Sequence, residues 1–286
     1  MKLLYLGTAA AEGIPAVFCL CHVCMTAREK KGKEIRTRSQ ALLDGKILFD
    51  FPPDSYCHYI TGIAAVDSSA ANTLVPDLPA IRHIFITHSH MDHFYPDELQ
   101  LRKPGFVTHR PVETLHIYGN RKVENKLLEL QKDENAVTYN KFHYAEPFRP
   151  IGVDNYLITP FPALHDRSEE CLFFAAEHDS KTLLYAHDTG FFPEPVWQCF
   201  SEKKMHFDAV SLDCTTAAFK DGNNHMGIAD CIDVRQKLIS TRAADDKTIF
   251  VLNHFSHNGG LNHDELCERT EKEGFIVAYD GLEIIV

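Results

Sequence analysis

Four metal-binding side chains, those of His88, His90, Asp92 and His93, fall within six positions directly after an apolar segment. That segment, residues 81–86, is rich in Ile and Phe and is typical of a β-strand. If the strand stays extended, His88 and His90 point to the same side, because side chains alternate with a period of two. A turn then aims Asp92 and His93 at a second position. Without a metal, these crowded groups would suffer desolvation and like-charge repulsion. The cluster therefore predicts a metal site and favours two ions over one.

Short apolar runs alternate with helical patterns along the chain, which favours a mixed α/β layout over a strict βαβ repeat. The predicted strands are residues 3–6, 40–43, 47–49, 81–86, 114–118, 156–161, 171–176, 182–186, 209–212, 249–252 and 276–278. The predicted helices are residues 121–131, 193–202, 227–239 and 263–272, and Asn262 is the expected N-cap of the last.

Polar residues follow three of these strands directly. Residues 161–165 end in His165, residues 183–190 place His187 and Asp188 before a Thr-Gly pair, and residues 249–254 end in His254. Loops held at strand ends by a rigid sheet readily assemble a site from several ligands. Imidazole and carboxylate ligands suit zinc, manganese or iron and do not select among them.

These motifs, in this order, resemble the metallo-β-lactamase superfamily over the chain from residue 6 to residue 257. The resemblance implies an α/β (α+β) fold, a four-layer αββα sandwich, with a dinuclear metal site at one edge of the paired sheets. It also implies a set of ligands. These are His88, His90 and His165 for one metal, Asp92, His93 and His254 for the other, and Asp188 as the bridge. His187 receives no role.

A second group of metal-binding side chains lies near the N-terminus, where Cys19, Cys21 and Cys24 form a C-x-C-x-x-C motif. The chain has nine cysteines, and the six outside this group are scattered, so their spacing does not resemble a secreted disulfide framework. Zinc in structural sites is almost always four-coordinate, so three thiols need a fourth ligand. His22 would compete awkwardly with its neighbours, and His257 is the better candidate.

The cysteine motif resembles one branch of the superfamily, the phosphodiesterase of the bacterial carbon–phosphorus lyase pathway and its relatives. In that branch a similar loop and a late histidine hold a structural zinc. A ligand of the second metal lies three residues before that histidine, as His254 lies before His257. Residues 6–8 and 36–42 also resemble the branch. The resemblance further implies a catalytic histidine in the loop after residues 213–215, for which His225 is the candidate.

The activity that this resemblance implies is metal-dependent hydrolysis of a small or cyclic phosphodiester by a hydroxide that two metal ions generate from water. Asp92 would orient that nucleophile, and His225 would protonate the leaving alkoxide or bind a phosphoryl oxygen. Arg36 and Arg38 are candidate phosphate contacts. The alternatives are a lactonase, a thioesterase or a tRNA 3′-endonuclease of the same fold, and a non-catalytic metal-binding scaffold.

The formal net charge of −11 disfavours general binding to DNA or RNA. The resemblance implies a small-molecule phosphodiester as the partner. No apolar run reaches the roughly 20 residues that span a bilayer, and the first residues do not resemble a signal peptide. We therefore expect a cytoplasmic protein without membrane contact.

No linker divides the chain, which predicts a single domain over residues 1–286, and a homodimer is an open alternative. Residues 52–80 form an Ala/Ser-rich insertion to which the sequence assigns no role.

Overall fold

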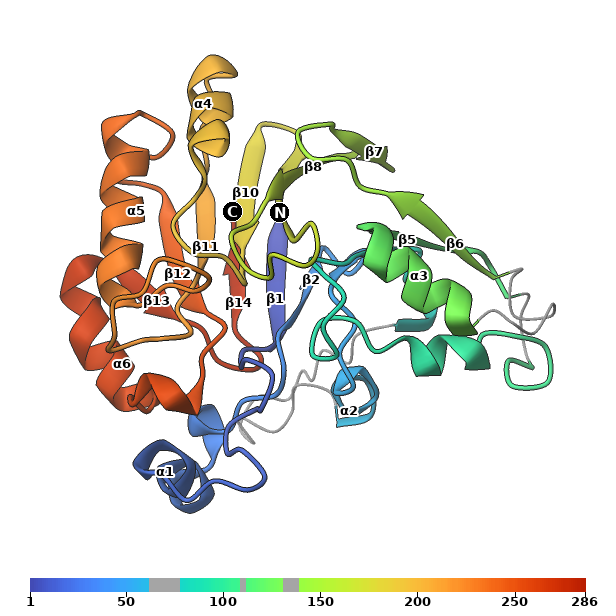
Figure 1. Ribbon diagram of the computed structural model, residues 1–286, viewed down its shortest axis with the longest axis horizontal. Helices are drawn as coiled ribbons and strands as arrows, with labels where there is room; N and C mark the ends of the chain where they lie inside the picture. The colour runs from blue at the N-terminus through green and yellow to red at the C-terminus, as the bar shows by residue number, and fades with distance from the viewer. Residues whose placement is uncertain (62–77, 109–111, 131–138) are drawn as a thin grey trace.

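Two mixed β-sheets lie face to face at the centre of the molecule (Figure 1). The structure, a computed structural model, describes residues 1–61, 78–108, 112–130 and 139–286. The first sheet has the order β14 (Glu283–Ile285), β1 (Lys2–Gly7), β2 (Gln40–Leu43), β3 (Ile47–Phe49), β4 (His83–Phe85), β5 (Leu115–Gly119), β6 (Asn140–Tyr144). The second has the order β13 (Phe275–Val277), β12 (Ile249–Asn253), β11 (Ala209–Asp213), β10 (Lys181–Ala186), β9 (Leu172–His178), β8 (Tyr156–Pro162), β7 (Ile151–Val153).

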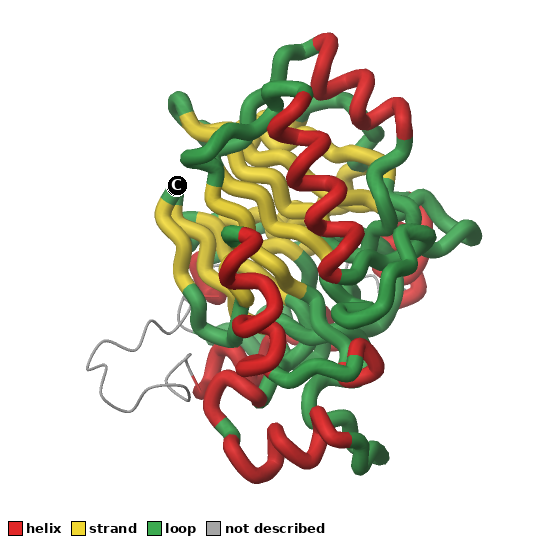
Figure 2. The backbone as a smooth tube through the Cα atoms, turned by 90° about the vertical axis from the view of Figure 1, so that its left-hand side faces the viewer, coloured by secondary structure: helices red, strands yellow, loops and turns green. Residues whose placement is uncertain are grey.

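Helices cover the outer faces of both sheets. On the first sheet α3 (Arg121–Leu130) buries Val123 and Leu127, which share one helix face because they are four residues apart. On the second sheet lie α4 (Glu194–Glu202), α5 (Ile228–Ser240) and α6 (His263–Thr270), and Figure 2 shows helices crossing this face. Two further helices, α1 (His22–Lys30) and α2 (Ser55–Thr61), precede β2 and follow β3 respectively. The layers therefore run helix, sheet, sheet, helix, as predicted.

The alternation of side chains along each strand divides the apolar residues among three cores. In β1, Leu3 and Tyr5 face the space between the sheets, whereas Leu4 and Leu6 face the outer core of the first sheet. Aromatic rings join the sheets at the centre, where Phe49 of the first sheet stacks on Tyr185 of the second, with ring centroids 4.6 Å apart. This packing fixes the two sheets relative to each other.

Each sheet has a parallel half, and these halves determine where loops meet. Strands β3 to β6 pair in parallel, and so do strands β10 to β13. Because the carboxyl ends of parallel strands lie at the same edge, the segments after β4, β10, β11 and β12 are brought together. The chain ends are neighbours as well, since the N-terminal nitrogen donates to Val286 O at 3.1 Å.

Every predicted strand and helix overlaps an observed element, with boundary shifts of a few residues. Asn262 caps α6 as predicted, because its side chain accepts a hydrogen bond from Glu265 N at 3.0 Å. The sequence patterns missed α1, α2, β6, β7 and β14, which are short or lack a clear apolar period. Residue 131 of one predicted helix and residues 62–77 of the predicted insertion lie outside the described residues. None of the described helices is long and apolar enough to cross a bilayer.

Candidate metal centre

The first predicted ligand group comes together at the sheet edge. One ligand atom each from His88, His90 and His165 lies within 4.8 Å of the others. His90 Nδ1 and His165 Nε2 are 3.3 Å apart, which matches the edge of about 3.3 Å expected between two nitrogens tetrahedrally bound to zinc. His88 Nε2 is buried and has no hydrogen-bond partner among the described residues. A buried imidazole nitrogen without a partner is what an ion at this position would satisfy.

The second predicted ligand group lies directly beside the first and consists of Asp92, His93, Asp188 and His254. His93 Nε2 and His254 Nε2 are 3.2 Å apart, again close to a tetrahedral edge. Asp188 Oδ2 contacts His93 Nε2 and lies 3.2 Å from His254 Nε2 and 3.8 Å from His88 Nε2. This carboxylate therefore faces both groups, as a bridging ligand would.

Burial and charge set the protonation of this cluster. Burial, reinforced by neighbouring imidazoles, holds the pKa of His88 well below its usual range, which keeps the ring neutral and able to bind a metal. Burial would also lower the pKa of His93, but Asp188, Asp50 and Asp92 raise it well above the ordinary value. In the absence of metal, His93 is therefore protonated at neutral pH, and a metal ion that binds it should displace a proton.

Two buried carboxylates that the sequence analysis did not select orient these ligands. Asp50 follows β3 and accepts hydrogen bonds from His93 Nδ1 at 2.7 Å and from Thr87 N at 2.8 Å. Asp213 ends β11 and accepts from the Asp188 backbone N–H at 3.0 Å. Both side chains are fully buried. Carboxylates that accept from the distal nitrogen of a ligand histidine fix its tautomer and orientation. Both residues lie at or directly after the end of an apolar strand, which is the signal that would have found them.

Three residues of this region hold a backbone conformation that side chains rarely adopt. The φ angles are 64° for Asp50, 48° for Asp188 and 61° for His254, all in the left-handed region. Each residue comes directly, or within two positions, after its strand. The left-handed turn redirects the chain at the sheet edge, and strain of this kind concentrates at functional sites.

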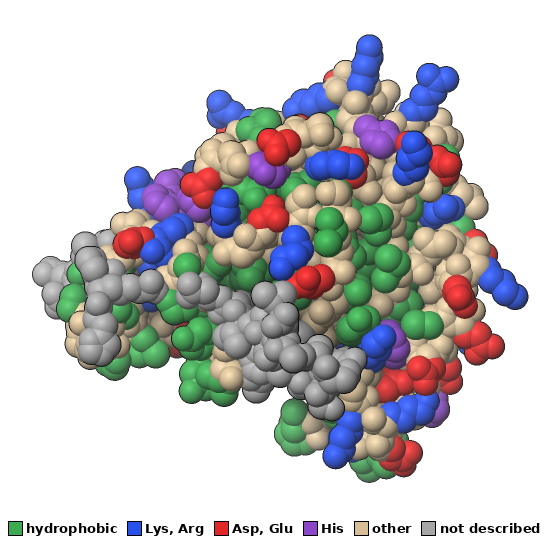
Figure 3. Space-filling view, turned by 180° about the vertical axis from the view of Figure 1, so that it is seen from behind, with side chains coloured by type: hydrophobic (Ala, Val, Ile, Leu, Met, Phe, Trp, Pro, Cys, Tyr) green, Lys and Arg blue, Asp and Glu red, His purple; other side chains and the backbone are tan. Residues whose placement is uncertain are grey.

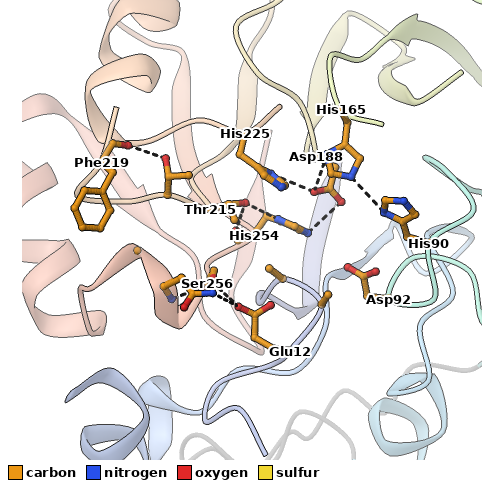
Figure 4. A pocket seen from close by; sticks show the side chains of 15 residues that line it. Glu12, His90, Asp92, His165, Asp188, Thr215, Phe219, His225, His254 and Ser256 are labelled. Atoms are coloured by element: carbon orange, nitrogen blue, oxygen red, sulfur yellow. Dashed lines mark hydrogen bonds and ion pairs between the residues drawn. The ribbon is translucent and has the colours of Figure 1, made fainter. Parts of the chain in front are cut away.

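A cavity of about 410 Å³ opens over the two ligand groups (Figure 4). His225 lines it, with Nδ1 3.1 Å from Asp213 Oδ2 and 3.4 Å from Asp188 Oδ1. Burial alone would lower the pKa of His225, but Asp213 and Asp188 raise it to about 9. Cations bound beside Asp188 would oppose this rise. The structure therefore places the predicted catalytic histidine next to the metal-binding groups, with a carboxylate holding its Nδ1.

A glycine allows the loop with His225 to approach so closely. A Cβ atom on Gly190 would lie 2.4 Å from Gly222 O and 2.5 Å from Asn223 O. Phe191 N also donates to Gly222 O at 2.9 Å, which ties the two loops together. The absence of a side chain at Gly190 thus sets the position of His225 relative to Asp188.

The cysteine motif and its predicted histidine partner also meet. Cys19, Cys21, Cys24 and His257 each place one ligand atom within 4.8 Å of the others. His257 Nδ1 is 3.5 Å from both Cys19 Sγ and Cys21 Sγ, close to the sulfur–nitrogen edge of about 3.6 Å in tetrahedral zinc. These four residues therefore fit a zinc ion.

Two histidines that neighbour predicted ligands in the sequence, and two arginines considered as phosphate contacts, make other contacts in the structure. His22 is not among the residues that meet at the cysteine cluster, and its Nε2 lies 3.2 Å from Glu265 Oε1. His187 is buried below the site, 2.7 Å from Ser211 Oγ, and burial lowers its pKa to about 3. The expectation that Arg36 contacts phosphate is wrong, because its buried guanidinium donates to Thr8 Oγ1 at 2.9 Å and to Ala278 O at 2.5 Å. The guanidinium of Arg38, the other candidate phosphate contact, donates to Asp54 Oδ2 at 3.0 Å.

The paired sheets with outer helices and the two ligand groups at their edge place this chain in the class of metal-binding αββα proteins. Residues 46–254 match the family described as the beta-lactamase superfamily domain, so the chain belongs to the metallo-β-lactamase superfamily, as predicted. Proteins of this fold bind divalent metal ions, typically zinc, and members of the superfamily are generally hydrolases. No curated protein sequence matches the chain.

Solved structures that resemble the chain include one from the branch that the cysteine motif indicated. A diphosphatase from the PhnP family is 22% identical, covers 100% of this chain and 97% of its own, and has a TM-score of 0.70. Zinc-bound PqqB from Methylobacterium extorquens is 18% identical, covers 100% of both chains and has a TM-score of 0.72. The short form of human tRNase Z is 15% identical, covers 100% and 99%, and has a TM-score of 0.62. At these identities the likeness establishes the fold.

Proposed function

We propose that this chain is a metal-dependent phosphodiesterase that hydrolyses a small or cyclic phosphodiester. The observation that carries the proposal is the pair of ligand groups that share Asp188 below one cavity, with His225 beside them. Two divalent ions roughly 3.5–4 Å apart form a clamp suited to in-line displacement at phosphorus. The similarity to a diphosphatase from the PhnP family favours phosphorus over carbon as the reacting centre.

The residues that would hold the ions are those predicted from the sequence. His88, His90 and His165 would bind the first, Asp92, His93 and His254 the second, with Asp188 between them, and Cys19, Cys21, Cys24 and His257 would bind a structural zinc. When bound, the two active-site ions, which we take to be zinc or manganese with iron as a third candidate, stabilise charge on the phosphoryl oxygens and acidify a water.

Two side chains of the cavity carry out the remaining steps. Burial opposes ionisation of Asp92, but the neighbouring His93 and His254 hold its pKa well below its usual range. The Asp92 carboxylate can therefore accept a hydrogen bond from the attacking hydroxide, whose formation from water has released one proton to solvent, and direct its oxygen to phosphorus. As that P–O bond forms, the ester P–O bond breaks, and His225 gives the proton on its Nε2 to the leaving alkoxide. Asp213 keeps Nδ1 engaged, so that Nε2 faces the cavity.

The test compares two leaving groups on the same ethyl phosphate, 4-nitrophenol and benzyl alcohol, in protein loaded with manganese or zinc. His225→Gln should slow the benzyl ester by about 10²–10³-fold, because its alkoxide needs a proton. It should slow the nitrophenyl ester by less than about tenfold. Asp92→Ala should abolish both reactions, and Asp179→Asn, at an exposed position, should change neither. Absence of turnover in fully metal-loaded protein would contradict the proposal.

Lactones and thioesters are the second substrate class, because the same metal clamp polarises a carbonyl, and parallel assays with both separate the classes. A tRNA substrate is disfavoured by the net charge of −11. On the face shown in Figure 3, acidic and basic side chains are interspersed, whereas a nucleic-acid surface presents a basic stripe. A single domain, a cytoplasmic location and a homodimer remain predictions.

A further inference from the structure

One carboxylate in the cavity belongs to neither ligand group. Glu12 lies in the loop after β1, and its side chain lines the same cavity as Asp188 and His225. In Figure 4 the labelled ligand residues His90, Asp92, His165 and Asp188 lie towards one side, Phe219 lies towards the other, and Glu12 and Ser256 lie between them. Glu12 thus lies in the same cavity as the ligand groups but outside them, where the non-reacting part of a bound diester would extend.

Contacts on one oxygen fix the orientation of this carboxylate. Glu12 Oε1 accepts a hydrogen bond from Ser256 Oγ and another from Asn258 Nδ2 at 3.4 Å. His257 Nε2 lies 3.5 Å from the same oxygen. Glu12 Oε2 has no hydrogen-bond partner among the described residues, and the side chain is 29% exposed. One oxygen therefore holds the group in place, and the other can accept a hydrogen bond from a ligand.

The rest of this wall is neutral. Thr216 and Asn258 contribute a hydroxyl and an amide, and the Phe219 side chain, 61% exposed, offers an apolar face. A carboxylate in such a wall attracts hydroxyl donors and repels a second anion. Ions held by the two ligand groups would attract the reacting phosphate, whereas Glu12 favours a neutral hydrogen-bond donor on the rest of the substrate.

We propose that Glu12 is a specificity-determining residue. It accepts a hydrogen bond from a hydroxyl on the non-reacting group of the diester and disfavours substrates that carry a further negative charge there. This inference rests on the proposed phosphodiesterase activity and narrows it to neutral, hydroxyl-bearing alcohols. A purely structural role, in which Glu12 only supports His257 in the cysteine site, predicts no dependence on the substrate.

The experiment uses three 4-nitrophenyl phosphodiesters that differ only in the second alcohol, which is ethyl, 2,3-dihydroxypropyl or 2-carboxyethyl. In the metal-loaded wild type, kcat/KM should be about tenfold higher for the dihydroxypropyl ester than for the ethyl ester. It should be about tenfold lower for the carboxyethyl ester, because two like charges would approach each other. In Glu12→Gln the amide oxygen stays on Ser256 and Asn258, so an uncharged NH2 group faces the ligand and can donate to a hydroxyl oxygen or to a carboxylate. This variant should keep part of the hydroxyl preference and lose the penalty on the carboxylate. Glu12→Ala should lose both effects.

Controls separate this role from its alternatives. Glu29→Gln, at an exposed position of α1, should keep the wild-type ratios. Loss of zinc from Glu12→Ala with unchanged substrate ratios would overturn the proposal and leave only the structural role. Dissociation constants for the same esters, from titration calorimetry, should show the same ratios. A chain that binds the esters with these ratios but does not hydrolyse them contradicts the phosphodiesterase proposal alone, and a chain that binds none contradicts both.

Discussion

Replacement of Asp50 by asparagine should weaken one active-site metal position selectively. In the wild type, Asp50 Oδ2 accepts from His93 Nδ1 at 2.7 Å, which leaves His93 Nε2 unprotonated when it binds a metal. An asparagine would present an NH2 group to the Nδ1 proton. The clash is relieved if the proton moves to Nε2, the nitrogen that faces Asp188 and the second ligand group.

The size of the effect follows from the contacts of Asp50. Its Oδ1 accepts from Thr87 N at 2.8 Å and from Thr87 Oγ1 at 3.0 Å, and an amide oxygen in that place preserves both bonds. A flipped amide would only move the mismatch to the Thr87 N–H. One charge-assisted hydrogen bond is therefore lost, about 1.5–3 kcal/mol. That range agrees with the 10–100-fold loss of metal affinity, about 1.4–2.7 kcal/mol, that removal of such outer partners typically causes.

Metal content after equilibrium dialysis, and affinities from chelator competition, provide the assay. Asp50→Asn should lose one active-site metal at chelator concentrations that leave the other metal and the cysteine-site zinc bound. Asp179→Asn is the matched control, because Asp179 is 85% exposed and lies in the turn before β10, at the other end of that strand from Asp188. Retention of both active-site metals at wild-type affinity would refute the argument that Asp50 sets the tautomer of His93.

Three further predictions concern other parts of the site and fold. Gly190→Ala would place a Cβ 2.4 Å from a backbone oxygen of the loop with His225, so kcat should fall about tenfold or more while both active-site metals stay bound. Cys24→Ser should release the cysteine-site zinc and lower the melting temperature, whereas Cys57→Ser should do neither. Burial lowers the pKa of His58 to about 4. Because the unfolded value is about 6.5, its contribution to stability is complete above pH 6.5 and about 3 kcal/mol of it is lost as the pH falls towards 4.

The measurements for these three differ. For Gly190→Ala, kcat and metal content are compared, and unchanged kcat would show that the loop does not need its present position. For the cysteine variants, released zinc is measured with a chromogenic chelator alongside thermal unfolding. For His58, the unfolding free energies of metal-free wild type and His58→Gln are compared between pH 4 and pH 7. Parallel pH curves for the two proteins would mean that His58 titrates normally in the folded chain.

Much of the candidate site could be predicted because its members have local signatures. His165, Asp188 and His254 each follow an apolar run, and a strand with its terminal loop is encoded within about ten residues. The roles given to them came from a resemblance of motifs in a fixed order, and the structure brings those residues together. The missed elements, such as β7 and β14, are three residues long and carry too few side chains to show a period.

The parts that could not be predicted depend on contacts between distant segments. Asp50 and His93 are 43 positions apart and meet only because β3 pairs with β4. Glu12 reaches Ser256 across 244 positions, and nothing in the sequence near Glu12 marks it as part of a cavity. No local pattern reports which strand end faces which loop, because that is fixed by the pairing and packing of whole sheets.

The choice between His22 and His257 shows this division in one place. The sequence alone determined that three thiols need a fourth ligand, because zinc coordination chemistry is local. The tertiary structure decided which imidazole is available. Helix α1 begins at His22 and turns its ring towards Glu265, while the turn after β12 brings His257 to the sulfur atoms. Ligand chemistry can be deduced from residue types and spacing, whereas the direction of each side chain depends on how the layers pack.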